Sequence, residues 1–134
     1  MWTLIDTSLW IDFTRARSPR RLKEFIAPLI LDPAAHLAEP IVFEILRHAT
    51  ADEHRQLTQQ FQTFPMLATP GDIWSRAAKL GQLCRERGVQ AGSLDLLITC
   101  VAIHHGAELI TFDQGFQPIS AVADLRVKIL SRPD

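Results

Sequence analysis

The chain has 134 residues, of which 47% are hydrophobic, and a formal net charge of −1 at pH 7. This length suits a single domain, residues 1–134, that can bury a hydrophobic core. The near-neutral charge excludes a global positive field, so any nucleic-acid binding must be local. No apolar run approaches the roughly 20 residues that a membrane span needs, and no signal-type segment opens the sequence. We therefore expect a cytoplasmic protein without membrane contact.

Strand-like and helix-like segments alternate along the chain without a linker or a repeat, which predicts one α/β layer structure. The expected strands are residues 2–5, 108–111 and 127–130. The expected helices share an apolar stripe at helical spacing; they start at Thr7 or Ser8, at Ser18 as N-cap with Pro19 first in the helix, at Pro40, at Asp52, at Thr69 and at Ser93 as N-cap. Pro28 is expected to kink or shorten the second of these, and Gly88 and Gly106 to end the last two.

The cysteines and tryptophans are expected to be structural. Cys84 and Cys100 fall on apolar faces of predicted helices and form no CxxC motif, so we interpret them as reduced core thiols. We expect Trp2 to lie in the core, and Trp10 and Trp74 to lie in the core or at an interface.

Four acidic residues stand where the sequence is otherwise apolar: Asp6, Glu44, Asp95 and Asp113. An ionised carboxylate beside Leu, Ile or Phe costs considerable free energy unless a positive group compensates it. A divalent cation is a compensation that converging acids can share. Carboxylates suit a hard cation such as Mg²⁺ or Mn²⁺, whereas zinc prefers Cys and His ligands that no spacing here supplies.

The predicted elements place these acids at positions typical of a ligand site. Asp6 and Asp113 come just after predicted parallel strands, at the edge where open α/β sheets bind ligands. Asp95 lies in the first turn of a helix, where the macrodipole favours a negative charge and should help to keep it ionised. Each acid alone could be a cap, a turn former or a solvent-facing residue, but these roles do not explain why three of them adjoin apolar runs. We interpret the remaining candidates as surface or capping acids: Asp12, Asp32, Glu39, Asp72 and Asp124.

In their order and spacing these segments resemble the PIN-domain ribonucleases and, at this length, the VapC toxins of type II toxin–antitoxin pairs. The resemblance is carried by LIDTSLWIDF at the start, EPIVFEILR, GS followed by DLLI, and HHGAELITFDQGF. It implies a PIN-like three-layer fold in which helices flank a central, mostly parallel sheet. It implies a site for Mg²⁺ or Mn²⁺ with four ligands and two polar neighbours: Asp6, Glu44, Asp95 and Asp113, with Ser8 and Thr111 beside them.

The resemblance further implies a metal-dependent endoribonuclease that hydrolyses structured or single-stranded RNA, such as tRNA or rRNA, and leaves 5′-phosphate and 3′-hydroxyl ends. Its expected partners are the RNA substrate, a second copy of the chain in a homodimer, and a cognate antitoxin. The antitoxin is expected to insert an Arg or Lys among the acids and to pack around Trp10 and Phe13.

A basic cluster follows the first predicted helix. Taken singly, each side chain is most simply a solvated charge on a helix face. Together they are placed to contact RNA phosphates beside the cut site, which would add affinity without sequence information. The residues of this cluster that we expect to contact RNA are Arg15, Arg17, Arg20 and Arg21.

One departure and three alternatives qualify the resemblance. Many relatives carry a further acid two residues after the fourth, where this chain has Gly115, so we expect a second metal to bind weakly or only with substrate. A PIN scaffold that binds RNA or a partner protein without cleavage is the competing function. A receiver-type domain would need a lysine after a late strand, and none of the three lysines fits. A HAD-type phosphatase would need a second Asp at the position of Ser8.

Overall fold

A five-stranded sheet lies at the centre of the computed structural model, which describes residues 1–134. The strands are β1 (Thr3–Ile5), β2 (Ala35–Ala38), β3 (Met66–Leu67), β4 (Glu108–Thr111) and β5 (Val127–Ile129). They are ordered β3-β2-β1-β4-β5, and every neighbouring pair is parallel. This confirms the predicted α/β fold with a central parallel sheet.

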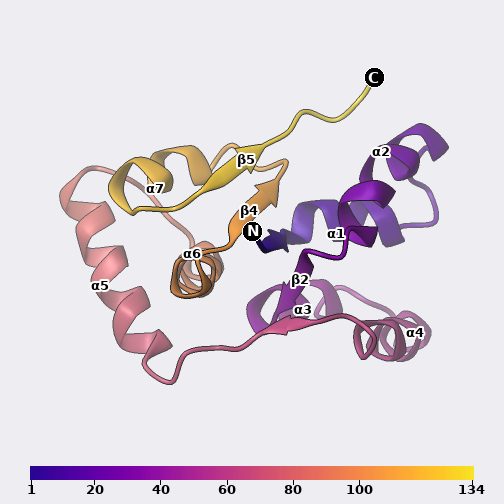
Figure 1. Ribbon diagram of the computed structural model, residues 1–134, viewed down its shortest axis with the longest axis horizontal. Coiled ribbons are helices and arrows are strands. Elements are labelled where there is room, and N and C mark those ends of the chain that lie inside the picture. Colours follow the sequence, from indigo (N-terminus) through magenta and orange to yellow (C-terminus); the bar gives the residue numbers. More distant parts are fainter.

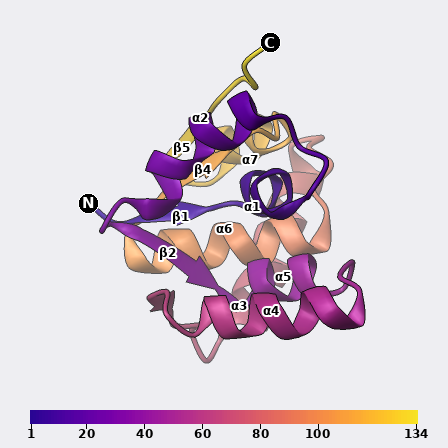
Figure 2. The same ribbon diagram turned by 90° about the vertical axis from the view of Figure 1, so that its right-hand side faces the viewer.

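Helices cover both faces of this sheet. They are α1 (Thr7–Thr14), α2 (Arg20–Leu31), α3 (Glu39–Leu46), α4 (Ala51–Phe61), α5 (Ile73–Glu86), α6 (Ser93–His105) and α7 (Phe116–Val122). Figures 1 and 2 show α5 and α6 on one side of the sheet and α1 and α2 on the other. None of these helices combines the length and the apolar character that crossing a membrane would take.

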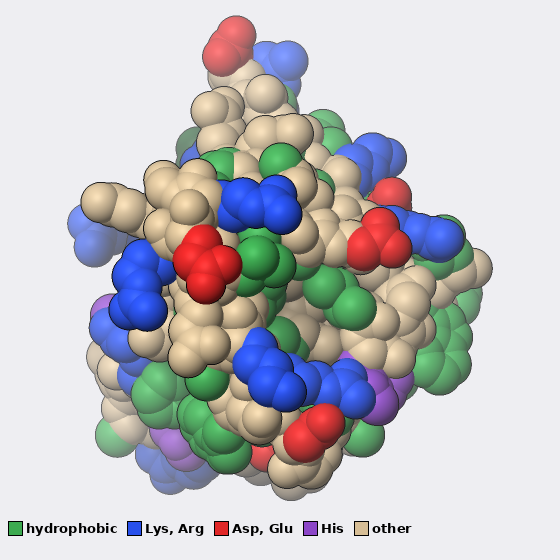
Figure 3. Space-filling view, turned by 90° about the vertical axis from the view of Figure 1, so that its left-hand side faces the viewer, with side chains coloured by type: hydrophobic (Ala, Val, Ile, Leu, Met, Phe, Trp, Pro, Cys, Tyr) green, Lys and Arg blue, Asp and Glu red, His purple; other side chains and the backbone are tan.

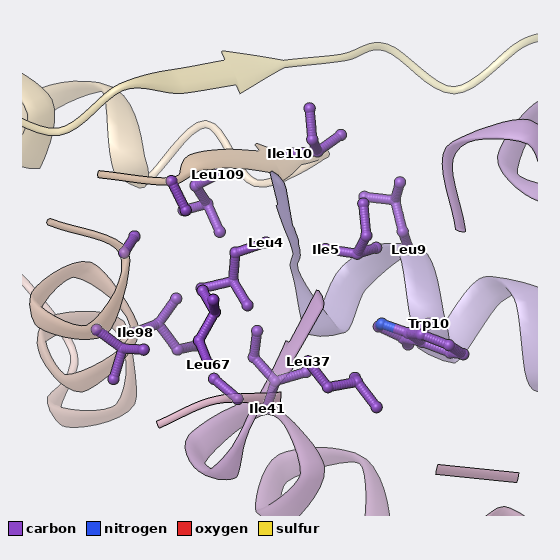
Figure 4. Close-up of a cluster of buried hydrophobic side chains, with 14 of the residues drawn as sticks. Leu4, Ile5, Leu9, Trp10, Leu37, Ile41, Leu67, Ile98, Leu109 and Ile110 are labelled. Atoms are coloured by element: carbon purple, nitrogen blue, oxygen red, sulfur yellow. The ribbon is translucent and has the colours of Figure 1, made fainter. Parts of the chain in front are cut away.

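The core lies on both faces of the strands. Leu4 of β1 pairs with Leu109 of β4, and because register partners in a parallel pair point to the same face, both side chains lie on one side. Figure 4 shows them on the side of Ile98 from α6, whereas Ile5 lies on the side of Leu9 from α1. All five side chains are buried. Burial on both faces explains why these strands are continuous apolar runs rather than alternating ones.

Two strands and one helix were not predicted. Strand β2 reads AHLA, and alanine is a weak strand former. Strand β3 has two residues and helix α7 has seven, so neither presents enough periods of an apolar pattern. Strand β2 exists because it lies between β1 and β3 in a buried sheet, which is a tertiary effect.

The second helix differs from its prediction at both ends. Helix α2 begins at Arg20 with Pro19 at the N-cap, so the prediction that Ser18 caps it is wrong. The helix also continues past Pro28 to Leu31. Pro28 removes one backbone hydrogen bond, to the carbonyl of Glu24, but both residues lie at the surface, so water can satisfy that carbonyl.

Two later helix starts are also corrected. Helix α5 begins at Ile73 rather than Thr69, because Pro70 and Gly71 form the turn before it. Helix α6 begins at Ser93 itself, with Gly92 at the N-cap and no side-chain capping bond. The predicted stop at Gly106 is confirmed, and its φ of 63° is the left-handed conformation that favours glycine.

The three tryptophans differ in burial. Trp10 is a core residue with 2% exposure, and its ring lies 5.4 Å from that of Phe61 and 5.1 Å from that of Phe64. Trp2 is 51% exposed, so the prediction that it lies in the core is wrong; it precedes β1 at the surface, and its ring lies 4.6 Å from that of His36 and 6.3 Å from that of His105. Trp74 on α5 is 73% exposed. The cysteines are buried and free, as predicted: Cys84 and Cys100.

Candidate metal centre

The carboxyl ends of β1 and β4 form the centre of the candidate site. These strands are neighbours, and the backbone N–H of Asp6 donates to the carbonyl of Ile110 at 2.9 Å. Strand β2, which follows β1 in the chain, pairs with one edge of β1, and β4 pairs with the opposite edge. Such a change of direction opens a crevice at the carboxyl ends of the strands, where α/β proteins bind ligands. Asp6 and Asp113 both lie at this edge.

Asp6 is a buried carboxylate with two hydroxyl donors. It is 4% exposed, and its Oδ2 accepts hydrogen bonds from Thr111 Oγ1 at 2.7 Å and Ser8 Oγ at 3.0 Å. Although Asp6 occupies the N-cap position of α1, its side chain makes no capping bond. Burial raises the pKa of Asp6, and the hydrogen bonds from Thr111 and Ser8 act in the opposite direction. The side chain is therefore held in place by two hydroxyl groups.

The segment after β4 is fixed by the same hydroxyls. The backbone N–H of Phe112 donates to Ser8 Oγ at 3.1 Å, and that of Asp113 donates to Thr111 Oγ1 at 2.9 Å. The Asp113 carboxylate in turn accepts from the backbone N–H of Gly115 at 2.8 Å through Oδ1. These bonds tie the orientation of Asp113 to that of the α1 N-terminus.

The four predicted acids share one electrostatic environment. Asp95 lies in the first turn of α6, and Glu44 is half-buried on α3. Burial, and then the negative charges of Asp113, Asp6 and Glu44, raise the pKa of Asp95 from 3.8 to about 6. Burial and repulsion oppose the helix dipole, yet a pKa of about 6 still leaves Asp95 mostly ionised at neutral pH. The repulsion also shows that the structure brings the four carboxylates near one another.

The donor set fits a hard cation. Carboxylates from four segments and the hydroxyls of Ser8 and Thr111 offer only oxygen, which Mg²⁺ and Mn²⁺ prefer. No three acidic, histidine or cysteine side chains are grouped tightly enough to form a closed cation site.

The predicted basic cluster lies at the other end of α1. Its side chains are exposed, and one of them, Arg20, pairs with Glu24 on α2 at 2.8 Å. Helix α1 has eight residues, so its two ends are about 12 Å apart. Arg15 and Arg17 lie in the segment that follows α1, and Arg20 and Arg21 are the first two residues of α2.

One of the acids interpreted as a surface residue is buried. Asp12 on α1 is 9% exposed, and its Oδ2 accepts a hydrogen bond from Arg132 Nε at 2.6 Å. The sequence contained a signal for this burial, because Asp12 is four residues after Ser8 and so lies on the same face of α1. Asp72 pairs at the surface with Arg76, as its interpretation predicted.

Comparisons with known proteins agree with this fold and site. The PIN domain family model matches residues 3–122. Ribonuclease VapC11 from Mycobacterium tuberculosis is 34% identical over 128 residues, covering 92% of this chain and 95% of VapC11. A toxin–antitoxin complex from Klebsiella pneumoniae contains a chain with 24% identity and a TM-score of 0.66, over 85% of this chain and 89% of that one. VapC20 from M. tuberculosis, described as a sarcin-ricin loop cleaving toxin, has 16% identity and a TM-score of 0.67, over 92% of this chain and 98% of that one.

A helix–sheet–helix fold with acids at the carboxyl edge of β1 and β4 is thus a PIN fold. The chain belongs to the PIN-domain family and is homologous to the VapC ribonuclease toxins of VapBC toxin–antitoxin systems. The resemblance found in the sequence is confirmed.

Proposed function

We propose that this protein, as a single domain of residues 1–134, is a Mg²⁺- or Mn²⁺-dependent endoribonuclease that acts as the toxin of a type II toxin–antitoxin pair. The observation that carries the proposal is the meeting of Asp6 and Asp113 at the carboxyl ends of the neighbouring strands β1 and β4, and the charges of Glu44 and Asp95, which act on the same site, support it. The homology to VapC ribonucleases supplies the reaction class.

The chain's own residues would hold the cation and orient it. Asp6 is fixed by the hydroxyls of Ser8 and Thr111, and Asp95, Glu44 and Asp113 complete the ligand set. When bound, such a cation supplies Lewis-acid stabilisation for hydrolysis of a phosphodiester. Metal-assisted hydrolysis proceeds by direct attack of water, so we expect products with 5′-phosphate and 3′-hydroxyl ends.

RNA is the proposed substrate, with tRNA or rRNA as the preferred class. The relative VapC20 is described as cleaving the sarcin-ricin loop, which supports a structured RNA. The exposed arginines at the far end of α1 are positioned to bind phosphates some nucleotides from the cut, since about 12 Å spans two nucleotides or more of backbone. They are Arg15, Arg17, Arg20 and Arg21.

Cleavage of total RNA by the purified protein tests the reaction. We expect Mg²⁺ and Mn²⁺ to support it, Ca²⁺ to support it poorly because of its looser coordination, and EDTA to abolish it. Asp6→Asn should remove cleavage, whereas Asp124→Asn, which changes an exposed acid of the loop after α7, should not. Full activity in EDTA, or cyclic-phosphate ends on the products, would contradict the mechanism. Metal-independent RNA binding without cleavage would favour a PIN scaffold instead.

A cognate antitoxin is the proposed protein partner, and both proteins would act in the cytoplasm. An Arg or Lys of the antitoxin would replace the cation's charge among the acids. The predicted contact at Trp10 is wrong, because Trp10 is buried against α4. The neighbouring groove between α1, α3 and α4 is the contact surface that we propose in its place; it combines apolar side chains such as Ile11 with charged ones such as Glu53.

Expression in the host tests the toxin role. The chain alone should arrest growth, co-expression of the adjacent antitoxin gene should relieve the arrest, and Asp6→Asn should be harmless. A wild-type chain that is harmless at high expression would contradict the toxin role even if RNA cleavage persists in the test tube.

We also propose a homodimer formed through an apolar patch on α3, α5 and α6. Phe43 is 57% exposed and Trp74 is 73% exposed, and Pro40, Leu94 and Leu97 lie between them. Figure 3 views the side of the molecule that carries α5 and shows hydrophobic side chains at the surface between basic ones. Exposed aromatic side chains of this size are typical of a surface that a partner covers. Phe43 and Leu94 are the sequence neighbours of Glu44 and Asp95, so the two active sites would lie near the dimer interface.

A further inference from the structure

The last residues of the chain form a contact that the reaction described above does not use. After β5 the backbone N–H of Leu130 donates to the carbonyl of Thr111 at 2.8 Å, so the chain leaves the sheet beside the candidate metal centre. Two residues later, Arg132 reaches α1, where its Nε lies 2.6 Å from Asp12 Oδ2. The Asp12 side chain is 13% exposed and the Arg132 side chain 52% exposed. A carboxylate buried to this degree requires a positive partner, and Arg132 supplies it.

Arg132 also contacts Phe112, which stands between Thr111 and Asp113 in the sequence. Its guanidinium carbon lies 4.6 Å from the centre of the Phe112 ring, within the range of a cation–π interaction. On α2, the ring of Phe25 stacks with the same ring at 6.3 Å and an interplanar angle of 23°. Phe112 is therefore buried between helix α2 and the C-terminal segment.

Phe112 is connected directly to the carboxylate of Asp6. Its backbone N–H donates to Ser8 Oγ, and Ser8 donates to Asp6. Ser8 and Asp12 are four residues apart and face the same side of α1. Helix α1 is thus joined to the end of β4 at two points, directly through Ser8 and, one turn later, through the Asp12–Arg132 pair.

We propose that Arg132 is a positioning residue for the metal centre. By holding Asp12 and the Phe112 ring together, it fixes the segment after β4 against α1, and so fixes Asp6 and Asp113 relative to each other. This inference rests on the proposed metal-dependent function. Removal of Arg132 leaves Asp12 buried without a partner and frees the Phe112 ring on one side, which should loosen the Phe112–Ser8 hydrogen bond while the sheet stays intact.

Amide hydrogen exchange of the metal-free protein, followed by NMR, tests the local effect. In Arg132→Ala the amide of Phe112 should exchange about tenfold faster or more, whereas the core amides of Leu4 and Leu109 should keep their rates. Arg132→Lys, which keeps the charge near Asp12, should restore part of the protection. Arg126→Ala is the matched control, because the side chain of this exposed arginine near the same end of the chain donates to the Met1 sulfur, at 3.6 Å, and its backbone bond to the Leu109 amide is kept in the variant.

Calorimetric titration with Mn²⁺ tests the consequence for the site. We expect Arg132→Ala and Asp12→Asn to weaken Mn²⁺ binding about tenfold and Arg126→Ala to leave it unchanged. Unchanged Mn²⁺ affinity in both variants would overturn the proposal. So would exchange that accelerates equally at Phe112 and at Leu4, which would mean that Arg132 stabilises the fold in general. If the wild type binds no Mn²⁺, the proposed metal-dependent function fails, and the exchange rate at Phe112 decides whether Arg132 positions this segment.

Discussion

Replacing Asp95 by asparagine should make the metal-free protein more stable at neutral pH. Burial and the charges of Asp113, Asp6 and Glu44 raise the pKa of Asp95 from 3.8 to about 6. The folded state therefore holds this proton more tightly than the unfolded state does. The stability that the folded state gains by binding this proton is complete below about pH 4. It is lost as the pH rises to about 6, where Asp95 ionises in spite of its negatively charged neighbours.

The size of the effect follows from the difference between the two pKa values. A difference of roughly two units corresponds to about 3 kcal/mol at most. Asp95 is only half-buried, so solvent screening should reduce this to about 1–1.5 kcal/mol. The asparagine side chain would keep the volume of the aspartate without its charge. For a chain of this size, we expect the Tm at pH 7.5 in EDTA to rise by about 3–6 °C.

Urea unfolding in EDTA at pH 4.5 and pH 7.5 provides the measurement. At pH 7.5 the free energy of unfolding of the wild type should be lower than that of Asp95→Asn, and at pH 4.5 this difference should be smaller. Asp124→Asn should behave like the wild type at both pH values, because the side chain of Asp124 is exposed. Added Mn²⁺ should stabilise the wild type and not Asp95→Asn. A loss of stability in Asp95→Asn at pH 7.5 without metal would refute the reasoning, because it would show that Asp95 makes net favourable contacts as an anion.

Further substitutions test the other parts of the site and surface. A Cβ at Gly115 would lie 3.0 Å from Asp113 Oδ1, so Gly115→Ala should displace that carboxylate and weaken Mn²⁺ binding a few-fold in calorimetry. Gly115→Asp should recover the affinity by adding a carboxylate; equal weakening in both variants would contradict this. Trp74→Ser should shift the protein toward monomer in sedimentation equilibrium by removing a large exposed apolar side chain, and an unchanged mass would exclude the proposed patch. The double variant Arg17→Gln, Arg21→Gln should bind RNA more weakly at every sequence and reduce the salt dependence of binding by about 1.4 in the log–log slope; an unchanged slope would exclude these side chains as phosphate contacts.

The sequence predicted those strands whose apolar runs are buried on both faces. β1 and β4 were recognised because Leu4, Ile5 and Leu109 belong to such runs, and this pattern is independent of what lies next to them. The predicted edge strand β5 is also present, although its Lys128 is exposed. Strand β2 was missed because its small residues gain their stability from the strands on either side. Local pattern thus identified the centre and one edge of the sheet, while the other edge depends on tertiary pairing.

The difference between local pattern and tertiary packing also explains the burial of Trp2 and Trp10. Both are large apolar residues beside a predicted element, and the sequence favoured burial for both. Trp10 is covered because α4 and the turn after it pack Phe61 and Phe64 against α1. Trp2 stays half-exposed although the rings of His36 and His105 lie beside it. The arrangement of later helices decides the outcome, and no pattern near either residue encodes it.

The acids show most clearly what a sequence pattern can establish. Asp12 stands between Ile11 and Phe13, so it meets the same criterion, a carboxylate in an apolar run, that selected Asp6. The criterion is physically sound for both, because each is buried and each needs a compensating positive charge. It does not say which charge: Asp12 takes that of Arg132, which is 120 residues away in the sequence, whereas Asp6 receives only neutral hydroxyl donors. A buried acid without a cationic side chain beside it is therefore the stronger indication of a metal ligand, and recognising it requires the three-dimensional structure as well as the sequence.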